Sequence, residues 1–267
     1  MNFWRNNTIW FDEVPEHLFC QIDLKEEKMK EFRNADIEYL ILWHQKHNKF
    51  GCLADIPRSL LYLELNWSNI QNFIGIEKLN TLKRLELHYC TKLHSDIGLS
   101  MVANTLEYLH INQSKKFVPT NELYSLKNLR VLCLNSCGNL ENLSFLNEFP
   151  SLIDFRFVNT NVIDGDLTPI INHKSIRSVG FLNKRPYNIS REKMDSLLIE
   201  KNEGIDYKTK IHKKNSEQYY PIGLTCCGEP YHKCRVTDTV IIGGNVVEDR
   251  EMASLHVHIN ASNQWLQ

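Results

Sequence analysis

The sequence predicts an α/β solenoid, a fold in which short parallel strands stack side by side and return segments complete each turn. The first observation is a repeated pattern of apolar residues at the first, fourth and sixth positions of a unit. The second is a nearly constant period, because successive units begin 22 to 24 residues apart. The seven units begin at Ile37, Leu60, Leu82, Leu106, Leu129, Leu152 and Ile176. A period held this closely predicts one structural unit per repeat.

Each middle unit also carries a small residue eight positions after its start, where a side chain can hydrogen-bond a buried turn. These residues are Ser68, Cys90, Ser114, Cys137 and Thr160. Pattern, period and small residue together are the signature of a leucine-rich repeat. We therefore expect a leucine-rich-repeat horseshoe with a parallel concave sheet over residues 37–188. Gln45 and Lys184 replace the small residue in the first and last units, as expected of terminal repeats that face solvent or a cap.

The segments that flank the repeats are expected to cover the ends of the array. Residues 1–36 are predicted to form an N-terminal cap, with the aromatic residues near the N-terminus packed on the first repeat. Residues 189–204 predict a capping helix, because Ser190 can cap its N-terminus and Met194 and Leu198 share one face.

The C-terminal part of the chain differs in composition from the repeats. Residues 205–219 are polar and rich in lysine, which predicts a linker or an exposed strand. Residues 220–267 predict a small β-rich appendage, with two strands joined through Gly243, Gly244 and Asn245. A further alternating strand is expected at 255–259.

Charge and composition exclude several classes of partner. The chain has 31 basic and 32 acidic side chains and a formal net charge of −1, so no strong field gathers nucleic acid or anionic membrane. The sequence shows neither a signal-peptide pattern nor an apolar stretch long enough to span a bilayer. We therefore expect a cytoplasmic protein with free thiols, and no nucleic-acid or membrane partner.

The residues that could carry chemistry give little support for catalysis. Cys226, Cys227, His232 and Cys234 are zinc-ligand types, but adjacent cysteines without a second paired motif do not match a zinc site. Asp164 and Asp166 are expected to form turns. The sequence therefore predicts no catalytic residue, no metal site and no cofactor.

Strand geometry predicts a binding surface on the concave face. Side chains alternate across a strand, so residues between the repeat leucines point away from the interior. Tyr, Trp and Arg supply much of the energy of protein interfaces. The expected partner-binding residues are Tyr39, Trp43, Tyr62, Glu64, Trp67, Arg84, Glu86, His88, Tyr108, His110 and Arg156. The alternative is that these rings pack on one another or under the N-terminal cap.

Two further sets of residues lie outside the strands, one just past the strand ends and one on the return side. The residues just past the strands are expected to border the same surface. They are His44, Trp67, Tyr89, Gln113 and Asn159. On the return side, Glu122 and Lys127 are expected to be exposed and close to neutral for both folding and binding.

Two short elements near the end of the array carry a family resemblance. The first, Asp164–Pro169 (DGDLTP), ends the repeat segment 129–170, and the second, Lys184–Asn188 (KRPYN), follows it. Over residues 55–190 the chain resembles small bacterial leucine-rich-repeat proteins that are internalin-like in repeat type but lack secretion and cell-wall signals. Nothing after about residue 200 is covered.

The resemblance implies a protein-binding module and not an enzyme. Some bacterial repeat proteins of this kind are encoded beside polymorphic toxins, which implies an immunity protein with a cognate toxin as its partner. The alternative hypothesis is a repeat domain that recruits substrate for a metal- or cysteine-containing C-terminal module. Metal analysis of the purified protein separates the two hypotheses.

Overall fold

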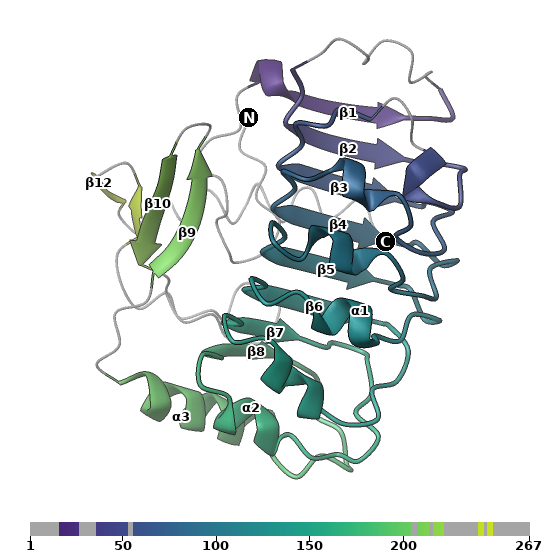
Figure 1. The fold of residues 1–267 in the computed structure, drawn as a ribbon. Coiled ribbons are helices and arrows are strands. Elements are labelled where there is room, and N and C mark those ends of the chain that lie inside the picture. Colours follow the sequence, from purple (N-terminus) through teal and green to yellow (C-terminus); the bar gives the residue numbers. More distant parts are fainter. Residues whose placement is uncertain are drawn as a thin grey trace.

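The computed structural model describes residues 16–26, 36–52, 56–203, 208–213, 216–221, 240–242 and 245–247. Its main feature is a single open sheet of eight parallel strands in the order β1 to β8, as an α/β solenoid requires (Figure 1). The strands are β1 (Phe19–Asp23), β2 (Tyr39–Trp43), β3 (Tyr62–Asn66), β4 (Arg84–His88), β5 (Tyr108–Asn112), β6 (Val131–Asn135), β7 (Asp154–Arg156) and β8 (Ser178–Gly180).

Equivalent positions of successive units lie opposite each other in the sheet. Leu63 pairs with Leu85, Leu85 with Leu109, and Leu109 with Leu132. All the repeat apolar residues, from Ile37 to Phe181, are buried in one continuous core on the interior face of the sheet. The strand positions predicted from the leucine pattern are therefore confirmed.

Short helices and turns carry the chain back from the end of one strand to the start of the next. The α-helices are α1 (Asn121–Tyr124) and α2 (Thr168–Asn172). The 3-10 helices are Glu16–Leu18, Phe50–Cys52, Ile76–Lys78, Leu99–Val102 and Ser144–Glu148. Gly75 shows how closely the returns pack: its φ is 96°, and a Cβ atom there would lie 2.0 Å from the nitrogen of Gly51.

The small residues eight positions into each unit bond to backbone groups, as predicted. Ser114 Oγ donates to the carbonyl of Cys90 at 3.1 Å, and Thr160 Oγ1 donates to the carbonyl of Leu134 at 2.6 Å. All five are buried. Because the bonds of Ser114 and Thr160 join neighbouring units, they help to fix the stacking on the side of the turns.

The sheet begins one strand earlier than the sequence predicts. β1 lies within the segment expected to be a cap, pairs in parallel with β2, and places Ile22 in the core. Gln45 is therefore not in a terminal unit, and it is fully buried instead of facing solvent. The aromatic residues expected to cover the first repeat, Phe3, Trp4, Trp10 and Phe11, lie outside the described residues.

Helix α3 (Arg191–Asn202) closes the other end of the array (Figure 1). Ser190 caps the helix, since its Oγ accepts from the Lys193 backbone N–H at 3.3 Å. Met194 and Leu198 enter the core. Lys201 Nζ donates to the carbonyls of Ile171 and Ile176, both at 3.1 Å, which ties α3 to the last unit. A helix therefore lies where the sequence predicts the capping helix.

The two short elements at the end of the repeats bond to each other. Asp166 Oδ1 accepts from the Thr168 N–H at 2.9 Å and from Asn188 Nδ2 at 2.6 Å, and the Asn188 N–H donates to the carbonyl of Gly165 at 3.0 Å. Asp164 accepts from the Asp166 N–H at 3.0 Å. Both acids therefore form turns, as predicted.

Two hairpins follow the helix in sequence. β9 (Lys208–Lys213) pairs antiparallel with β10 (Ser216–Pro221), so the segment expected to be a linker or an exposed strand contains strands. β11 (Val240–Ile242) pairs antiparallel with β12 (Asn245–Val247), which confirms the hairpin predicted there. The strand expected at 255–259 lies outside the described residues. Within the described part of the chain, no helix combines the length and apolar character needed to cross a bilayer.

Candidate functional site

The predicted binding residues other than Trp67, which follows β3, lie on the sheet face opposite the core, but most of them are buried. Buried side chains on this face are Tyr39, Tyr62, Glu64, Arg84, Glu86, His88, Tyr108 and His110. Trp43 and Arg156 are half-buried, whereas Trp67 is 49% exposed. The expectation of an exposed concave row is therefore wrong for the eight buried residues. Neighbouring strands lie only about 4.8 Å apart, so large side chains in register pack against one another.

Arg84 shows how this mutual burial works. Its register partners are Tyr62 on β3 and Tyr108 on β5. The guanidinium carbon lies 4.0 Å from the centroid of the Tyr108 ring and 5.5 Å from that of Tyr62. Both distances are within the range of a cation–π interaction. The cation on β4 thus lies between a phenol ring on β3 and another on β5.

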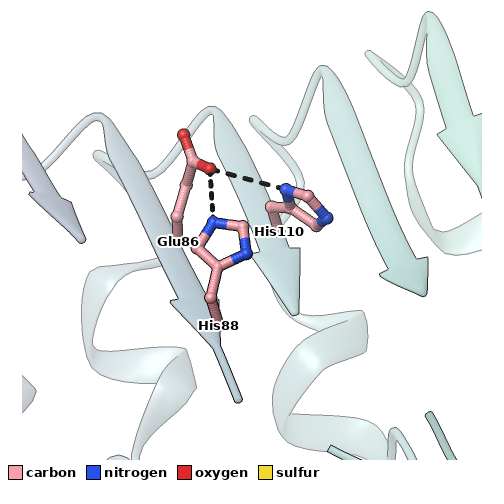
Figure 2. A group of neighbouring side chains, drawn as sticks. All are labelled: Glu86, His88 and His110. Atoms are coloured by element: carbon pink, nitrogen blue, oxygen red, sulfur yellow. Dashed lines mark hydrogen bonds and ion pairs between the residues drawn. The ribbon is translucent and has the colours of Figure 1, made fainter. Parts of the chain in front are cut away.

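Glu86 is the centre of a buried polar network (Figure 2). Its Oε1 accepts from Arg84 Nε at 2.8 Å and lies 2.6 Å from a second guanidinium nitrogen. Its Oε2 lies 2.9 Å from His88 Nε2 and 3.5 Å from His110 Nδ1. Glu86 and His88 are two residues apart on β4, and His110 is the register partner of Glu86 on β5. The two rings therefore converge on one carboxylate oxygen.

A second buried carboxylate lies beside the first. Glu64 Oε2 accepts from the Tyr62 hydroxyl at 2.5 Å, and Glu64 Oε1 accepts from Asn66 Nδ2 at 2.6 Å. The Tyr62 hydroxyl also lies 3.4 Å from Glu86 Oε1. One phenol therefore links the two carboxylates, and the network extends from β3 to β5.

The electrostatics of the network favour an ionised Glu86 and a neutral His110. Burial alone would raise the pKa of Glu86, but the charge of Arg84 and the hydrogen bonds from His110 and His88 hold it well below its usual range. Burial lowers the pKa of His110, although the bond to Glu86 opposes this shift. Burial and the charges of Glu64 and Glu86 raise the pKa of Tyr62.

Two asparagines contact the remaining ring nitrogens. Asn135 Nδ2 lies 3.1 Å from His110 Nε2, and Asn112 Nδ2 lies 3.5 Å from His88 Nδ1. Asn135 Oδ1 accepts from the Val158 N–H at 3.0 Å, which leaves its amide nitrogen to donate to His110. This network assigns the proton of the neutral His110 ring to Nδ1, which faces Glu86.

The second part of the site is the edge of the sheet where the strands end, at which Trp67 and Asn159 are exposed and Ser136 is buried. Six residues there have left-handed backbone conformations, with φ between 51° and 60°: His44, Trp67, Tyr89, Gln113, Ser136 and Asn159. We call them the strand-end ridge. Trp67 stacks on Tyr89, with ring centroids 4.6 Å apart and planes 3° apart. Left-handed backbone is uncommon for residues other than glycine, and such strain gathers at functional sites.

The other half of the ridge borders a polar hollow. It has a volume of about 510 Å³ and is lined by Gln113, Lys115, Ser136, Cys137, Gly138, Asn139, Asn159 and Asn161. Gln113 and Asn159 lie just past their strands, as expected from the sequence, whereas the hollow and Ser136 were not expected. No motif marks these residues, and the only signal is that they follow β5, β6 and β7. The ridge thus joins an aromatic half to a carboxamide-rich half.

Three of the described cysteines, Cys90, Cys133 and Cys137, are buried in the repeats. Burial raises the pKa of the Cys90 and Cys137 thiols to about 12, and burial also raises the pKa of Cys133. Thiols of this kind stay protonated near neutral pH and are poor nucleophiles. Cys226, Cys227, His232 and Cys234 lie outside the described residues.

A scan against protein-family models returns no match for this chain. A search of curated proteins also returns none. The case for function therefore rests on the sequence pattern and on the geometry of the sheet face and the strand-end ridge.

Proposed function

We propose that this chain is a leucine-rich-repeat protein that binds a protein partner and does not catalyse a reaction. The exposed Trp67 side chain, stacked on Tyr89 at the strand-end ridge, carries the proposal. A large aromatic side chain with one face on a ring and another in solvent brings much apolar area at low entropic cost. The adjoining polar hollow supplies the hydrogen-bonding rim typical of an interface.

The buried face of the sheet has a supporting role in this proposal. Arg84, Glu86, His88 and their partners hold β3, β4 and β5 in register, and Trp67 and Tyr89 directly follow β3 and β4. The ridge residues are therefore presented from a rigid surface, which lowers the entropy lost on binding. Of the predicted partner-binding residues, we assign direct contact to Trp67, with Trp43 and Arg156 at the margin.

The resemblance to small bacterial repeat proteins extends the proposal to a cognate toxin that the protein neutralises in the cytoplasm. The alternative, a substrate-recruiting domain for a C-terminal metal or cysteine module, depends on residues outside the described part. The protonated state of Cys90 and Cys137 supports a non-catalytic repeat domain.

The test is affinity capture with the full chain as bait, followed by calorimetry with the captured partner. The protein encoded beside this one is the first candidate to test. We expect Trp67→Ala to weaken binding by about 2 kcal/mol or more, as for a central interface anchor. Lys127→Ala is the matched control, because Lys127 is exposed and pairs only at the surface with Glu148 at 2.6 Å. It should change binding by less than about 0.5 kcal/mol.

Thermal melting of both variants separates loss of binding from loss of fold. Trp67→Ala should melt close to the parent protein, since the side chain is half exposed. If it melts normally and binds the partner as tightly as the parent does, the ridge is not the binding surface. If Lys127→Ala is the variant that loses binding, the partner lies on the return side of the solenoid.

A further inference from the structure

We propose that Glu86, His88 and His110 form a binding site for one divalent transition-metal ion, for which zinc is the best match. The inference goes beyond the proposed protein-binding function and does not depend on it. It rests on the placement of two imidazoles and one carboxylate, all buried, whose ligand atoms lie within 4.8 Å of one another.

The fold brings these ligands together by simple strand geometry. Glu86 and His88 are two residues apart on β4 and so lie on the same face of the sheet. His110 lies opposite Glu86 in the parallel register of β4 and β5. The His88 and His110 rings are nearly perpendicular, with centroids 4.8 Å apart, and each directs a nitrogen toward Glu86 Oε2 (Figure 2).

The spacing of the ligand atoms suits a small ion. With metal–ligand bonds of about 2.0–2.1 Å, a tetrahedral site has ligand–ligand distances of about 3.3 Å. Glu86 Oε2 lies 2.9 Å from His88 Nε2 and 3.5 Å from His110 Nδ1, on either side of that value. Two nitrogens and one oxygen are also the ligands of open zinc sites, which keep a fourth position for water or another ligand.

Neighbouring side chains already hold the ligands in orientation. Arg84 binds Glu86 Oε1 and leaves Oε2 facing the two rings. Asn112 and Asn135 contact the ring nitrogens that point away from Glu86. Metal-binding histidines nearly always donate the other ring N–H to an acceptor, and loss of that partner weakens binding about 10- to 100-fold. Both asparagines contact the rings through an amide nitrogen, so they position the rings but do not themselves supply that acceptor.

The contact between Asn135 and His110 allows a specific test of metal binding by His110. In the metal-free network it donates to His110 Nε2, so the ring proton faces Glu86 at Nδ1. A metal at Nδ1 requires that proton to move to Nε2, where it needs an acceptor instead of a donor. Asn135→Asp supplies that acceptor and keeps an oxygen for the Val158 N–H. We therefore expect this variant to bind metal more tightly than the parent protein.

The experiment uses the full chain, stripped of metal with a chelator and titrated with Co²⁺, with Zn²⁺ as competitor. We expect one ion per chain, visible absorption bands of a cobalt site, and no strong thiolate-to-cobalt band in the near ultraviolet. That last feature distinguishes this site from one built on Cys226, Cys227 and Cys234. Binding should also raise the melting temperature, because the unfolded chain lacks the assembled site.

Variants assign the ligands. His110→Gln and Glu86→Gln should each weaken Co²⁺ binding at least about tenfold. His94→Gln is the matched control, since His94 is an exposed histidine outside the cluster whose ring Nδ1 lies 3.0 Å from the carbonyl of Lys92. It should leave binding unchanged. Asn135→Asp should strengthen binding about tenfold.

Several results would overturn the proposal. One is the absence of Co²⁺ and Zn²⁺ binding to the folded parent chain. Another is a cobalt spectrum with a strong thiolate band, which would assign the metal to cysteines elsewhere. If the ligand variants fail to fold, Asn135→Asp decides the matter, because unchanged or weaker binding in that variant excludes His110 as a ligand.

Discussion

On the interior face of β3, β4 and β5 every strand side chain is apolar, whereas the opposite face of the same strands buries two carboxylates, a guanidinium and two imidazoles. The interior face gains stability from area removed from water, which any apolar side chain of similar volume provides. The opposite face depends on particular partners, because a buried charge that loses its counterpart is costly. Side chains are buried on both faces, but the interior face should tolerate substitution better than the opposite face.

The largest effect is expected from placing a charge on the interior face. Leu109 is fully buried at the middle of the array. Leu109→Asp puts an unpaired carboxylate there and should cost more than about 4 kcal/mol, enough to unfold the array. Circular dichroism on heating measures this. The control Leu109→Met conserves volume and should cost less than about 1.5 kcal/mol. An unchanged melting curve for Leu109→Asp would contradict the stacked-core architecture.

A slightly smaller effect is expected from removing the cation on the opposite face. Arg84→Met leaves Glu86 buried without its guanidinium partner and should cost about 3–5 kcal/mol. Adding Glu86→Gln should recover part of this loss, because the buried charge disappears as well. Denaturant unfolding of both single variants and the double variant gives the coupling. Strictly additive costs would show that the two side chains do not stabilise each other.

The strand-end ridge lies where the strands end, and the stability of the protein should depend there on backbone conformation more than on burial. Gln113 has a φ of 60°. Gln113→Val places a β-branched residue in the left-handed region and should cost about 1–2 kcal/mol. Gln113→Asn, which tolerates this conformation, is the control and should be close to neutral. Equal stability of the two variants would show that the turn relaxes without strain.

The smallest effect is expected on the return side, where neither face is disturbed. The sequence analysis treated Glu122 and Lys127 alike, but only Lys127 is exposed. Glu122 Oε2 accepts from Ser100 Oγ at 2.6 Å and from the N–H groups of Gly98 and Ser100, both at 3.2 Å. Glu122→Gln should therefore cost about 1 kcal/mol at neutral pH. Lys127→Ala should cost less than about 0.5 kcal/mol.

The loss of stability in Glu122→Gln should depend on pH. The Ser100 hydroxyl has the largest effect on Glu122 and lowers its pKa in the folded protein; burial opposes this, and the Ser100 and Gly98 N–H groups lower the pKa further. A lowered folded pKa gives stability that is present above the unfolded pKa of about 4.3 and lost as the pH falls through the folded value. The stability difference between the parent protein and Glu122→Gln should therefore be constant above about pH 5 and shrink in acid. A difference that grows in acid would contradict this assignment.

The strands β2 to β8 could be predicted because each repeats the same three apolar positions. β1 could not, because Cys20 pairs with Leu40 and breaks the leucine pattern, and because it lies only 20 residues before its partner. The sheet face of each candidate residue also followed from the alternation of a strand. The register that joins Glu86 to His110 was present in the sequence as well, since both occupy the fifth position of their units.

What the sequence did not reveal was the burial of that face and the direction of each hydrogen bond. Alternation says where a side chain points, but not how much of it the neighbouring rings cover. The coverage of Arg84 depends on the side-chain conformations of Tyr62 and Tyr108. The left-handed turns and the hollow depend on backbone torsions, for which His44, Trp67 and Gln113 give no local signal such as glycine.

The unshifted register from β2 to β6 bears on how such a chain can grow or shrink in evolution. Because equivalent positions always face each other, duplication or loss of one whole unit leaves every backbone pairing intact. Units that contribute to the Glu86 network are an exception, since His110 and Asn135 must stay one and two units after Glu86. Length variation among relatives of this chain should therefore gather toward β7 and β8 and spare the segment from β3 to β6.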